Sequence, residues 1–399
     1  MKTNRIALVG ARVLPITSEP IERGTVVMAD GRIEAVGDEN LAIPPGTEIV
    51  DAHGRWILPG LVDAHTHLGT LEDGEGWAGD DHDEATEPVT ARLRAMDGIN
   101  HADIGFRDAV AGGVLTVGVN PGSCNPIAGQ SVALRTSGAT VEAMVLREPC
   151  GLKSALGENP KKAYGSQGKM PSTRMGIAAV IRQALTQARD YDKHRSQDTA
   201  IDLDLEALSL ALRGDIPWRQ HVHRADDIAT ALRLAEEFGY RLVIDHGTEA
   251  AAFAETLAAR QIPVVLGPLI VGRAKSELRN RSLRTAGVLA AAGVRISIAT
   301  DHSVVPIHFL VHQATLAVKE GLHPTTALEA LTINPANVLG VDDRIGSIEP
   351  GKDADLCVWS GDPLDVMQRV EMAYVLGRRI FQYDYERRAG LFEGYTWTP

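Results

Sequence analysis

Several hydrophobic runs of this chain end in side chains that commonly bind metals. The side chains at these ends are His65, His67, His221, His223, His246 and Asp301. Imidazole nitrogens together with a carboxylate suit zinc and its first-row neighbours. Ligands that are far apart in sequence but follow successive strands meet at one mouth of a barrel of parallel strands. The pattern predicts a metal-dependent hydrolase.

The pair His65 and His67 is the most informative of these groups. The two residues lie two positions apart in an apolar run that is typical of a strand. Residues two apart on a strand point to the same face, so one metal ion can take both nitrogens from one rigid element. A His-x-His pair also arises by chance. The upstream Pro59-Gly60 and the downstream Leu68-Gly69 turn favour the functional interpretation.

Size and composition limit the classes of function. A chain of 399 residues exceeds what one core usually holds, so we expect one large domain with an appendage. The net charge of −12 disfavours a nucleic-acid partner, because phosphate binding needs a basic surface. Three scattered cysteines fit a reducing compartment, and no apolar run approaches the roughly 18 residues of a membrane span. We therefore expect a cytoplasmic protein that binds a small molecule and no membrane, with a homo-oligomer left open.

The two ends of the chain share a pattern of short β-rich runs separated by turns. Asp30-Gly31 is a hairpin signal between two such runs, and residues 345–359 read as a turn followed by a strand. We predict a small composite β-sandwich domain built from residues 1–58 and 342–399. It would flank a barrel formed by residues 59–341.

The middle of the chain alternates predicted strands and helices. Helical patterns over residues 225–238, 250–260 and 283–292 each precede a strand-like run. This alternation is typical of a parallel sheet, and the predicted fold class is α/β with a (β/α)8 TIM-like barrel. Two helices are predicted over 171–191 and 203–213, where a standard barrel needs only one, and the extra helix indicates an insertion. The acidic segment 69–87 is expected at the mouth, as a lid or as a solvated loop.

Two motifs give the chain a family resemblance. The run Leu58-Pro59-Gly60-Leu61-Val62-Asp63-Ala64-His65-Thr66-His67 is similar to the opening signature of the amidohydrolase superfamily, and residues 346–356 are similar to its C-terminal signature. The similarity spans essentially the whole chain and is greatest to the imidazolonepropionase-related branch. It implies a (β/α)8 barrel with a flanking β domain. It also implies one or two divalent metal ions that activate water, with zinc expected first and iron or manganese as alternatives.

The resemblance also implies roles for four of the residues above. His65 and His67 match the ligands of the first strand, His246 matches that of the sixth strand, and Asp301 matches the aspartate of the eighth strand. Asp301 would accept a proton from the attacking water and deliver it to the leaving nitrogen. The metal or His246 would polarise the scissile carbonyl. The structural alternative is that Asp301 only caps the segment that follows it.

The fifth-strand ligand is ambiguous from sequence. The superfamily usually places this ligand four residues after a proline that opens the strand, which favours His221 after Pro217. His223 would then support the ligands or face the substrate. Superfamily deaminases usually carry a glutamate three residues after this histidine. This chain has Arg224 or Asp226 there, depending on which histidine is the ligand, and so the deaminase alternative is disfavoured.

A bridging ligand between two metal ions is expected in the run Gly151–Glu158. Lys153, in carboxylated form, is one candidate, because strand alternation gives it small neighbours on its own face. Glu158 is the rival, because it lies nearer the end of the strand and needs no modification. A lysine with a purely structural salt bridge is the alternative to both.

Substrate contacts are expected from the loops that follow the strands. The candidates besides His223 are Asn120, Tyr164 and Arg174, with Arg273 in another segment near the mouth. An arginine at such a position can bind a substrate carboxylate through two parallel hydrogen bonds.

The predicted function is therefore metal-dependent hydrolysis of an amide or other C–N bond in a small molecule. The substrate would be a cyclic amide, an N-acyl amino acid or a dipeptide-like compound. Deamination of a ring amine is the enzymatic alternative. A catalytically inactive scaffold is a third possibility, but nothing structural requires the complete set of metal-binding side chains.

Overall fold

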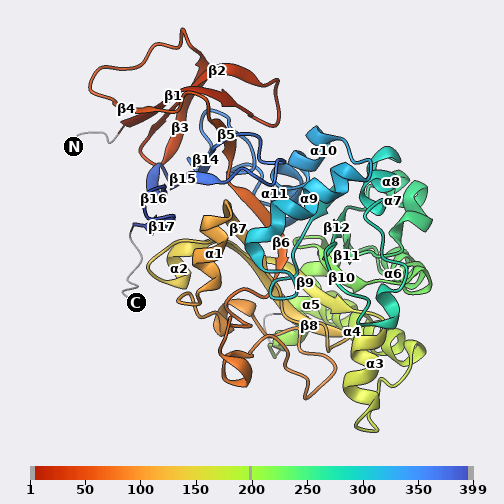
Figure 1. Ribbon diagram of the computed structural model, residues 1–399. Coiled ribbons are helices and arrows are strands. Elements are labelled where there is room, and N and C mark those ends of the chain that lie inside the picture. The colour runs from red at the N-terminus through yellow and green to blue at the C-terminus, as the bar shows by residue number, and fades with distance from the viewer. Residues whose placement is uncertain (1–4, 197–199, 394–399) are drawn as a thin grey trace.

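The computed structural model describes residues 5–196 and 200–393, and its strands form two sheets (Figure 1). The first sheet contains β1 (Arg5–Val13), β2 (Ile21–Ala29), β3 (Arg32–Asp38), β4 (Glu48–Asp51), β5 (Trp56–Pro59), β14 (Leu356–Trp359), β15 (Val370–Val375), β16 (Arg378–Asp384) and β17 (Ala389–Phe392). The second contains β6 (Leu61–Thr66), β7 (Val114–Val119), β8 (Ile127–Arg135), β9 (Val145–Ala155), β10 (Trp218–Val222), β11 (Leu242–His246), β12 (Val264–Leu266) and β13 (Ile296–Ile298). The two ends of the chain supply the first sheet and the middle supplies the second.

The nine-stranded sheet joins the chain ends through β5. Its order is β17-β16-β15-β14-β5-β1-β2-β3, and β4 pairs with β1. β5 runs parallel to β1 and antiparallel to β14, so that Leu356 pairs with Pro59. Leu8, Met28 and Ile57 are buried together in a core to which strands from both ends of the chain contribute. The predicted combination of the two chain ends in one β unit is thus present.

The eight-stranded sheet is a nearly closed barrel. Its order runs from β13 back to β6 in the reverse of the chain order. The first and last strands meet beyond their carboxyl ends, because the backbone N–H of Asp301 donates to the carbonyl of His65 (3.1 Å) and that of His67 donates to the carbonyl of His302 (2.8 Å). The carboxyl ends of β6 and β13 are therefore held side by side.

One strand departs from the predicted parallel arrangement. β8 runs antiparallel to both of its neighbours, β7 and β9, whereas the other neighbouring pairs in the barrel are parallel. A parallel connection needs a dozen or more residues, and only residues 120–126 separate β7 from β8. The regular strand–helix alternation expected throughout 59–341 is therefore wrong for the first half of the barrel.

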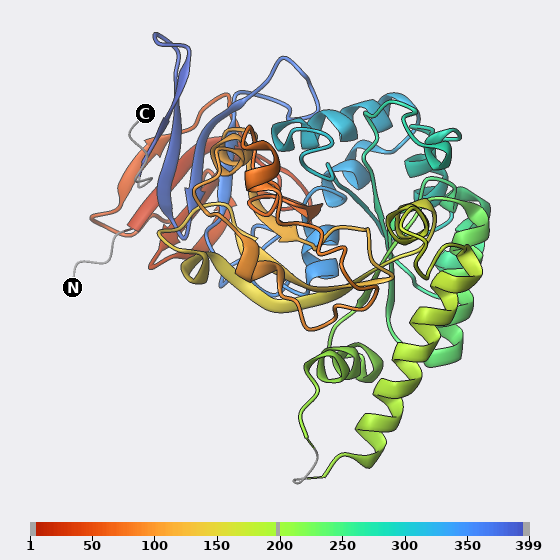
Figure 2. The ribbon, with the colours of Figure 1, turned by 90° about the horizontal axis from the view of Figure 1, so that it is seen from below.

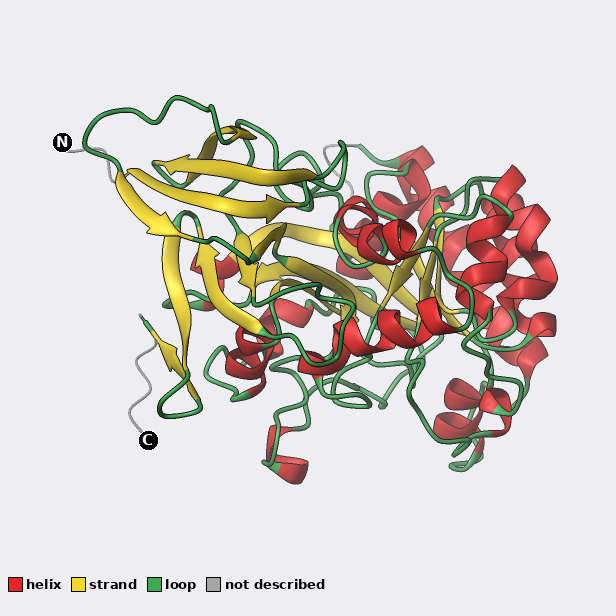
Figure 3. Cartoon of the chain, turned by 45° about the horizontal axis from the view of Figure 1, so that its top comes forward, coloured by secondary structure: helices red, strands yellow, loops and turns green. Residues whose placement is uncertain are grey.

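Helices cover the outside of the barrel (Figure 3). The α-helices are α1 (Gly105–Ala111), α2 (Val141–Met144), α3 (Glu158–Gly165), α4 (Arg174–His194), α5 (Leu203–Arg213), α6 (Ala225–Phe238), α7 (Ala254–Ala259), α8 (Thr285–Ala291), α9 (Leu310–Lys319), α10 (Pro324–Glu329) and α11 (Ile333–Leu339). Short 3-10 helices are η1 (Gly76–Gly79), η2 (Ala95–Gly98), η3 (Ala250–Phe253), η4 (Ser276–Leu278) and η5 (Ile307–Phe309). α6, α7 and α8 alternate with β10 to β13, which confirms the alternation predicted for the second half.

The helices predicted over 171–191 and 203–213 are present as α4 and α5, and α3 precedes them between β9 and β10. Helices α4 and α5 pack against each other, and the C-terminal half of α4 projects below the rest of the molecule in Figure 2. Asp202 caps α5 by accepting hydrogen bonds from the backbone N–H groups of Asp204 and Leu205, and Gly214 ends it in the left-handed conformation. No helix in 5–196 or 200–393 combines the length and the apolar character that a membrane span requires.

A buried ionic cluster connects β8 to the segment that precedes β14. The Arg135 guanidinium donates to Asp353 (2.5 Å) and to Asp355 (2.8 Å), and all three side chains are buried. Arg344 donates to the same Asp353 carboxylate (2.7 Å). Because Arg135 belongs to the barrel and Asp355 leads into the other sheet, these ion pairs link the two sheets.

Replacing Arg135 by methionine removes the ion-pair partner of the buried Asp355 carboxylate and one of the partners of Asp353. We expect Arg135→Met to lower the free energy of unfolding by about 3–5 kcal/mol, the usual result when one partner of a buried ion pair is removed. Urea denaturation followed by circular dichroism measures this change. The exposed pair Arg23–Glu39 provides the control, since Arg23→Met should cost less than about 1 kcal/mol. Equal losses in the two variants would contradict the linking role.

Candidate metal centre

The predicted ligands converge at the carboxyl ends of the barrel strands. Donor atoms of His65, His246 and Asp301 lie within 4.8 Å of one another. The Nε2 atoms of His65 and His67 are 3.5 Å and 3.4 Å from Oδ1 of Asp301. Strand alternation brings His65 of β6 and His67, directly after it, to the inner face, and the hydrogen bonds between the ends of β6 and β13 bring Asp301 beside them.

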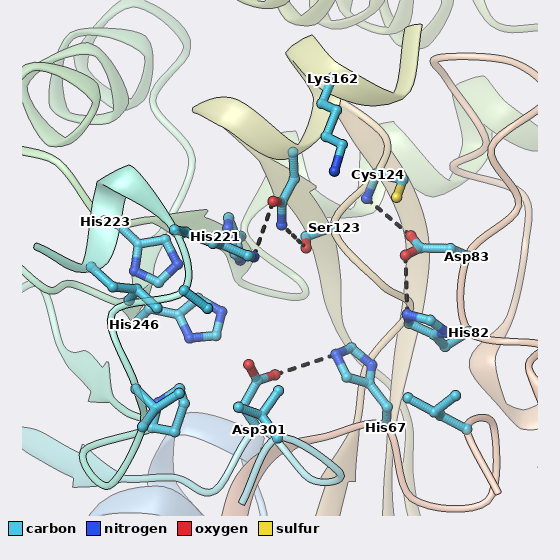
Figure 4. Close-up of a pocket in the computed structure, with 18 of the residues that line it drawn as sticks. His67, His82, Asp83, Ser123, Cys124, Lys162, His221, His223, His246 and Asp301 are labelled. Carbon is cyan, nitrogen blue, oxygen red and sulfur yellow. Dashed lines mark hydrogen bonds and ion pairs between the residues drawn. The ribbon is translucent and has the colours of Figure 1, made fainter. Parts of the chain in front are cut away.

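A second donor group shares one histidine with the first. Donor atoms of His221, His223 and His246 also lie within 4.8 Å of one another. The ring centroids of His221 and His246 are 4.4 Å apart, and those of His223 and His246 are 4.9 Å apart. The close-up in Figure 4 shows these three rings on one side of a cavity, with Asp301 and His67 beside them. The two histidines that compete for the fifth-strand position therefore stand in the same group.

The backbone at two of the donors is unusual. His246 has a φ of 72° and Asp301 a φ of 54°, both in the left-handed region that non-glycine residues rarely adopt. His246 ends β11, and Asp301 lies three residues after the end of β13. Such strained positions concentrate at functional sites, where the surrounding structure compensates for the local cost.

The donor set fits a divalent metal ion. Both ring nitrogens of His221 are buried, and within the described part of the chain they have no hydrogen-bond partner. Burial and the neighbouring imidazoles hold the pKa of His221 and of His223 well below the ordinary value, so both rings are neutral at pH 7. Burial also lowers the pKa of His65 to about 4 and that of His246 to about 3. Neutral imidazoles with free lone pairs are what metal coordination requires.

Asp301 supplies the negative charge of the cluster. Burial alone would raise its pKa, but the facing imidazoles of His246, His67 and His65 outweigh burial and lower the pKa below the usual range. The carboxylate is therefore ionised at neutral pH. It can act as a metal ligand or as a hydrogen-bond acceptor for water.

Backbone carbonyls orient two of the rings. Nδ1 of His67 donates to the carbonyl of Asn120 (2.8 Å), and Nδ1 of His246 donates to the carbonyl of Gly267 (2.7 Å). Since a carbonyl oxygen only accepts, these bonds require the proton on Nδ1. When the ring is neutral, Nε2 is then the free lone pair facing the cluster.

A buried ion pair between Arg219 and Asp245 lies next to Nδ1 of His65. Nδ1 of His65 lies 3.3 Å from Oδ2 of Asp245, and Arg219 donates to Asp245 (2.6 Å) and to the carbonyl of Ala64 (3.0 Å). Arg219 and Asp245 are fully buried. Outer partners of this kind fix the orientation of a ligand ring and raise its basicity. The sequence analysis missed both residues, although a charged residue inside an apolar strand run was a usable signal.

Of the two candidate bridging residues, the structure brings only Lys153 to the donor groups. Its side chain is fully buried, and Nζ lies 3.4 Å from Nε2 of His65 and 3.1 Å from the carbonyl of Pro121. Burial lowers the pKa of this ammonium group. Glu158 instead begins α3, where its backbone N–H donates to Glu277 (2.7 Å), and it does not line the cavity.

Only one of the residues predicted to contact the substrate lines the cavity. His223 lines the cavity, whereas Asn120, Tyr164 and Arg174 do not. The Tyr164 hydroxyl donates to Asn125 (2.5 Å) inside the core. Arg174 is held by the carboxylates of Asp227 (2.9 Å) and Glu277 (3.2 Å).

Arg273 is also engaged away from the cavity, since its Nε donates to the carbonyl of Arg279 (3.0 Å). The roles suggested for these residues from sequence thus have no support from their placement, except for His223.

The cavity above the donor groups has a volume of about 540 Å³. A pocket of this size takes a small molecule. Besides the donors, its lining contains residues that sequence reasoning did not single out, namely His82, Asp83, Ser123, Cys124, Asn159, Lys162 and Lys275. His82 and Asp83 come from the acidic segment 69–87, which confirms that part of this segment lies at the mouth.

Comparisons with known proteins identify relatives over most of the chain. The model of the amidohydrolase family matches residues 151–384. The amidohydrolase tasK of Hapsidospora irregularis is 28% identical over 384 residues, covering 87% of this chain, and this chain spans 38% of the length of that relative. The imidazolonepropionase of Rhizorhabdus wittichii is 29% identical over 378 residues, which are 90% of this chain and 92% of that protein.

Among solved structures, an amidohydrolase from Thermotoga maritima MSB8 has the same fold. It is 46% identical, with a TM-score of 0.91, and the match covers 94% of this chain and 100% of that chain.

Removing the carboxylate beneath His65 should weaken metal binding. We expect Asp245→Asn to lower the affinity for zinc by roughly 10- to 100-fold, as loss of an outer partner typically does. Competition with a chromophoric chelator measures the affinity, and circular dichroism checks that the variant folds. Asp190→Asn, at an exposed position, is the control and should bind zinc like the unmodified protein. Unchanged affinity in a folded Asp245→Asn variant would show that Asp245 does not support the site.

Proposed function

The chain belongs to the amidohydrolase family of hydrolytic enzymes that act on C–N bonds, and on this premise we propose that it hydrolyses an amide or other C–N bond of a small molecule. The substrate classes proposed are cyclic amides, N-acyl amino acids and dipeptide-like compounds. The observation that carries the proposal is the convergence of His65, His246 and Asp301 within 4.8 Å beside a small-molecule cavity, which His246 and Asp301 line.

In this proposal the metal ligands are His65, His67, His246 and Asp301, together with a fifth-strand histidine. His221 is favoured over His223 for that place, because both of its ring nitrogens lack another partner among the described residues while Nδ1 of His223 lies 2.8 Å from the Thr248 hydroxyl. Zinc is the first choice of metal, and iron or manganese would suit the same donors. When bound, a divalent ion supplies Lewis acidity, which makes water nucleophilic at neutral pH and polarises a carbonyl group.

Lys153 is the proposed bridging residue. A buried ammonium group beside neutral imidazoles is costly, and its lowered pKa makes the neutral amine more accessible. Reaction of that amine with carbon dioxide forms a carbamate and releases a proton. The product is an anion, which would match a site that holds two cations.

Asp301 is the proposed proton carrier. Its ionised carboxylate faces the cavity and lies within 3.5 Å of the His65 and His67 rings. It would accept a proton from the attacking water and deliver it to the leaving nitrogen. His246 suits the role of a ligand better than that of a hydrogen-bond donor to the substrate, because its Nδ1 proton is engaged by Gly267.

The architecture is proposed to be a variant of the (β/α)8 barrel with one reversed strand. Its predicted boundaries are residues 59–341, with residues 1–58 and 342–399 forming the composite β-sandwich domain. The nine-stranded sheet and its enclosed core support this division.

Removal of Asp301 should suppress the reaction. We expect Asp301→Asn to lower kcat by roughly 10²- to 10⁴-fold, the range typical of a lost acid–base group. A screen of N-acyl amino acids, dipeptides and cyclic amides first identifies a substrate, and metal analysis then separates loss of the metal from loss of proton transfer. Asp343→Asn, at an exposed position, is the matched control. Activity that survives in Asp301→Asn and His65→Ala alike would refute the mechanism.

Dependence on a metal ion is a separate prediction. Prolonged treatment with a chelator should abolish hydrolysis, and addition of zinc, manganese or iron should restore it. Elemental analysis of the purified protein gives the number of ions per chain. Full activity of a protein shown to contain no metal would exclude the proposed chemistry.

A further inference from the structure

The wall of the cavity that faces the donor groups is polar and positively charged. One face of α3 forms much of this wall, because the lining residues Asn159, Lys162, Ala163 and Ser166 recur at the three- and four-residue spacing of a helix. Figure 4 shows Lys162 reaching into the cavity from the side opposite Asp301 and His67. The helix thus presents a cation toward the space above the ligands.

A second lysine reaches the same wall from the segment between β12 and η4. Nζ of Lys275 donates to Oδ1 of Asn159 (3.0 Å), and Nδ2 of Asn159 donates to the Ser123 hydroxyl (2.7 Å). These bonds fix the positions of Lys275, Asn159 and Ser123 relative to one another. Three segments that are far apart in sequence therefore build one continuous polar surface.

The charges on this wall are not compensated by the protein. Among the residues that the structure describes, no carboxylate lies within 4.0 Å of Nζ of Lys162 or of Lys275. The acidic lining residue other than Asp301 is Asp83, which is engaged by His82 (3.1 Å) and by the backbone N–H of Cys124 (2.9 Å). Lys162 is exposed to solvent and Lys275 is half-buried, and both line the cavity. In a chain with a net charge of −12, two cations at one cavity without a carboxylate partner favour an anionic ligand.

We propose that Lys162 and Lys275, with Asn159 and Ser123, bind a carboxylate of the substrate while its C–N bond lies over the donor groups. The substrate class is then an amide that carries a free carboxylate, such as an N-acyl amino acid or a cyclic amide acid. This inference rests on the proposed hydrolase function. A volume of about 540 Å³ allows one small molecule to reach both walls.

Matched pairs of ligands test the proposal. A panel of N-acetyl amino acids is compared with the corresponding N-acetyl amino acid amides, which have the same shape and no carboxylate. Calorimetry measures binding, and release of the amino compound measures hydrolysis. We expect the unmodified protein to prefer the acids by roughly 10- to 100-fold, as is typical for charge-assisted hydrogen bonds.

Variants then assign that preference to the two lysines. The double variant Lys162→Met/Lys275→Met should bind an acid no better than its amide. Lys161→Met is the control, because Lys161 is the exposed neighbour of Lys162 and does not line the cavity, and it should keep the preference.

Equal binding of acids and amides by the unmodified protein, or no binding of any acid, would overturn the proposal. A preference that survives in the double variant would also overturn it. Binding that follows the prediction without hydrolysis of any panel member would contradict the hydrolase function and leave the carboxylate site supported.

Discussion

Burial of several metal-binding side chains in one small volume is the constraint on which the rest of the structure depends. A buried polar group without a partner costs about 1–3 kcal/mol, and His221 alone has two such nitrogens within the described residues. Polar contacts from the surrounding protein reduce this cost for other rings of the site. Carbonyl groups hold His67 and His246, and the ion pair of Arg219 and Asp245 supports His65. One donor atom from each of His221, His223 and His246 lies within 4.8 Å of the others, and a divalent cation there would satisfy an unpartnered nitrogen.

The reversed strand β8 is connected directly to this centre. Because β8 follows β7 without a helix, the connection 120–126 stays at the carboxyl end of the barrel. It supplies the carbonyl of Asn120 to His67, that of Pro121 to Lys153, and the hydroxyl of Ser123 to the cavity wall. The departure from a regular barrel therefore provides both the support of His67 and Lys153 and part of the opposite wall.

The two sides of the cavity are built from different kinds of structural element. The strand ends carry the donors, which are rigid because the hydrogen bonds of the sheet fix them. Loops and the face of α3 carry Lys162, Asn159 and Lys275, which lie where variation does not disturb the barrel. Such a division is common in barrel enzymes, in which chemistry is held on the strands and specificity on the loops.

The sequence by itself determined the family, the grouping of His65, His67, His246 and Asp301 as candidate donors at one end of the barrel, and the alternation of α6, α7 and α8 with their strands. These features are encoded locally, in motifs and in the period of apolar residues. Only the tertiary structure decided that β8 is reversed, that Lys153 rather than Glu158 lies beside His65, and that Arg174 is engaged by carboxylates away from the cavity. It also brought together Ser123, Asn159 and Lys275. The physical reason is that such contacts join residues far apart in the chain, and no local pattern specifies which distant partner a polar side chain will meet.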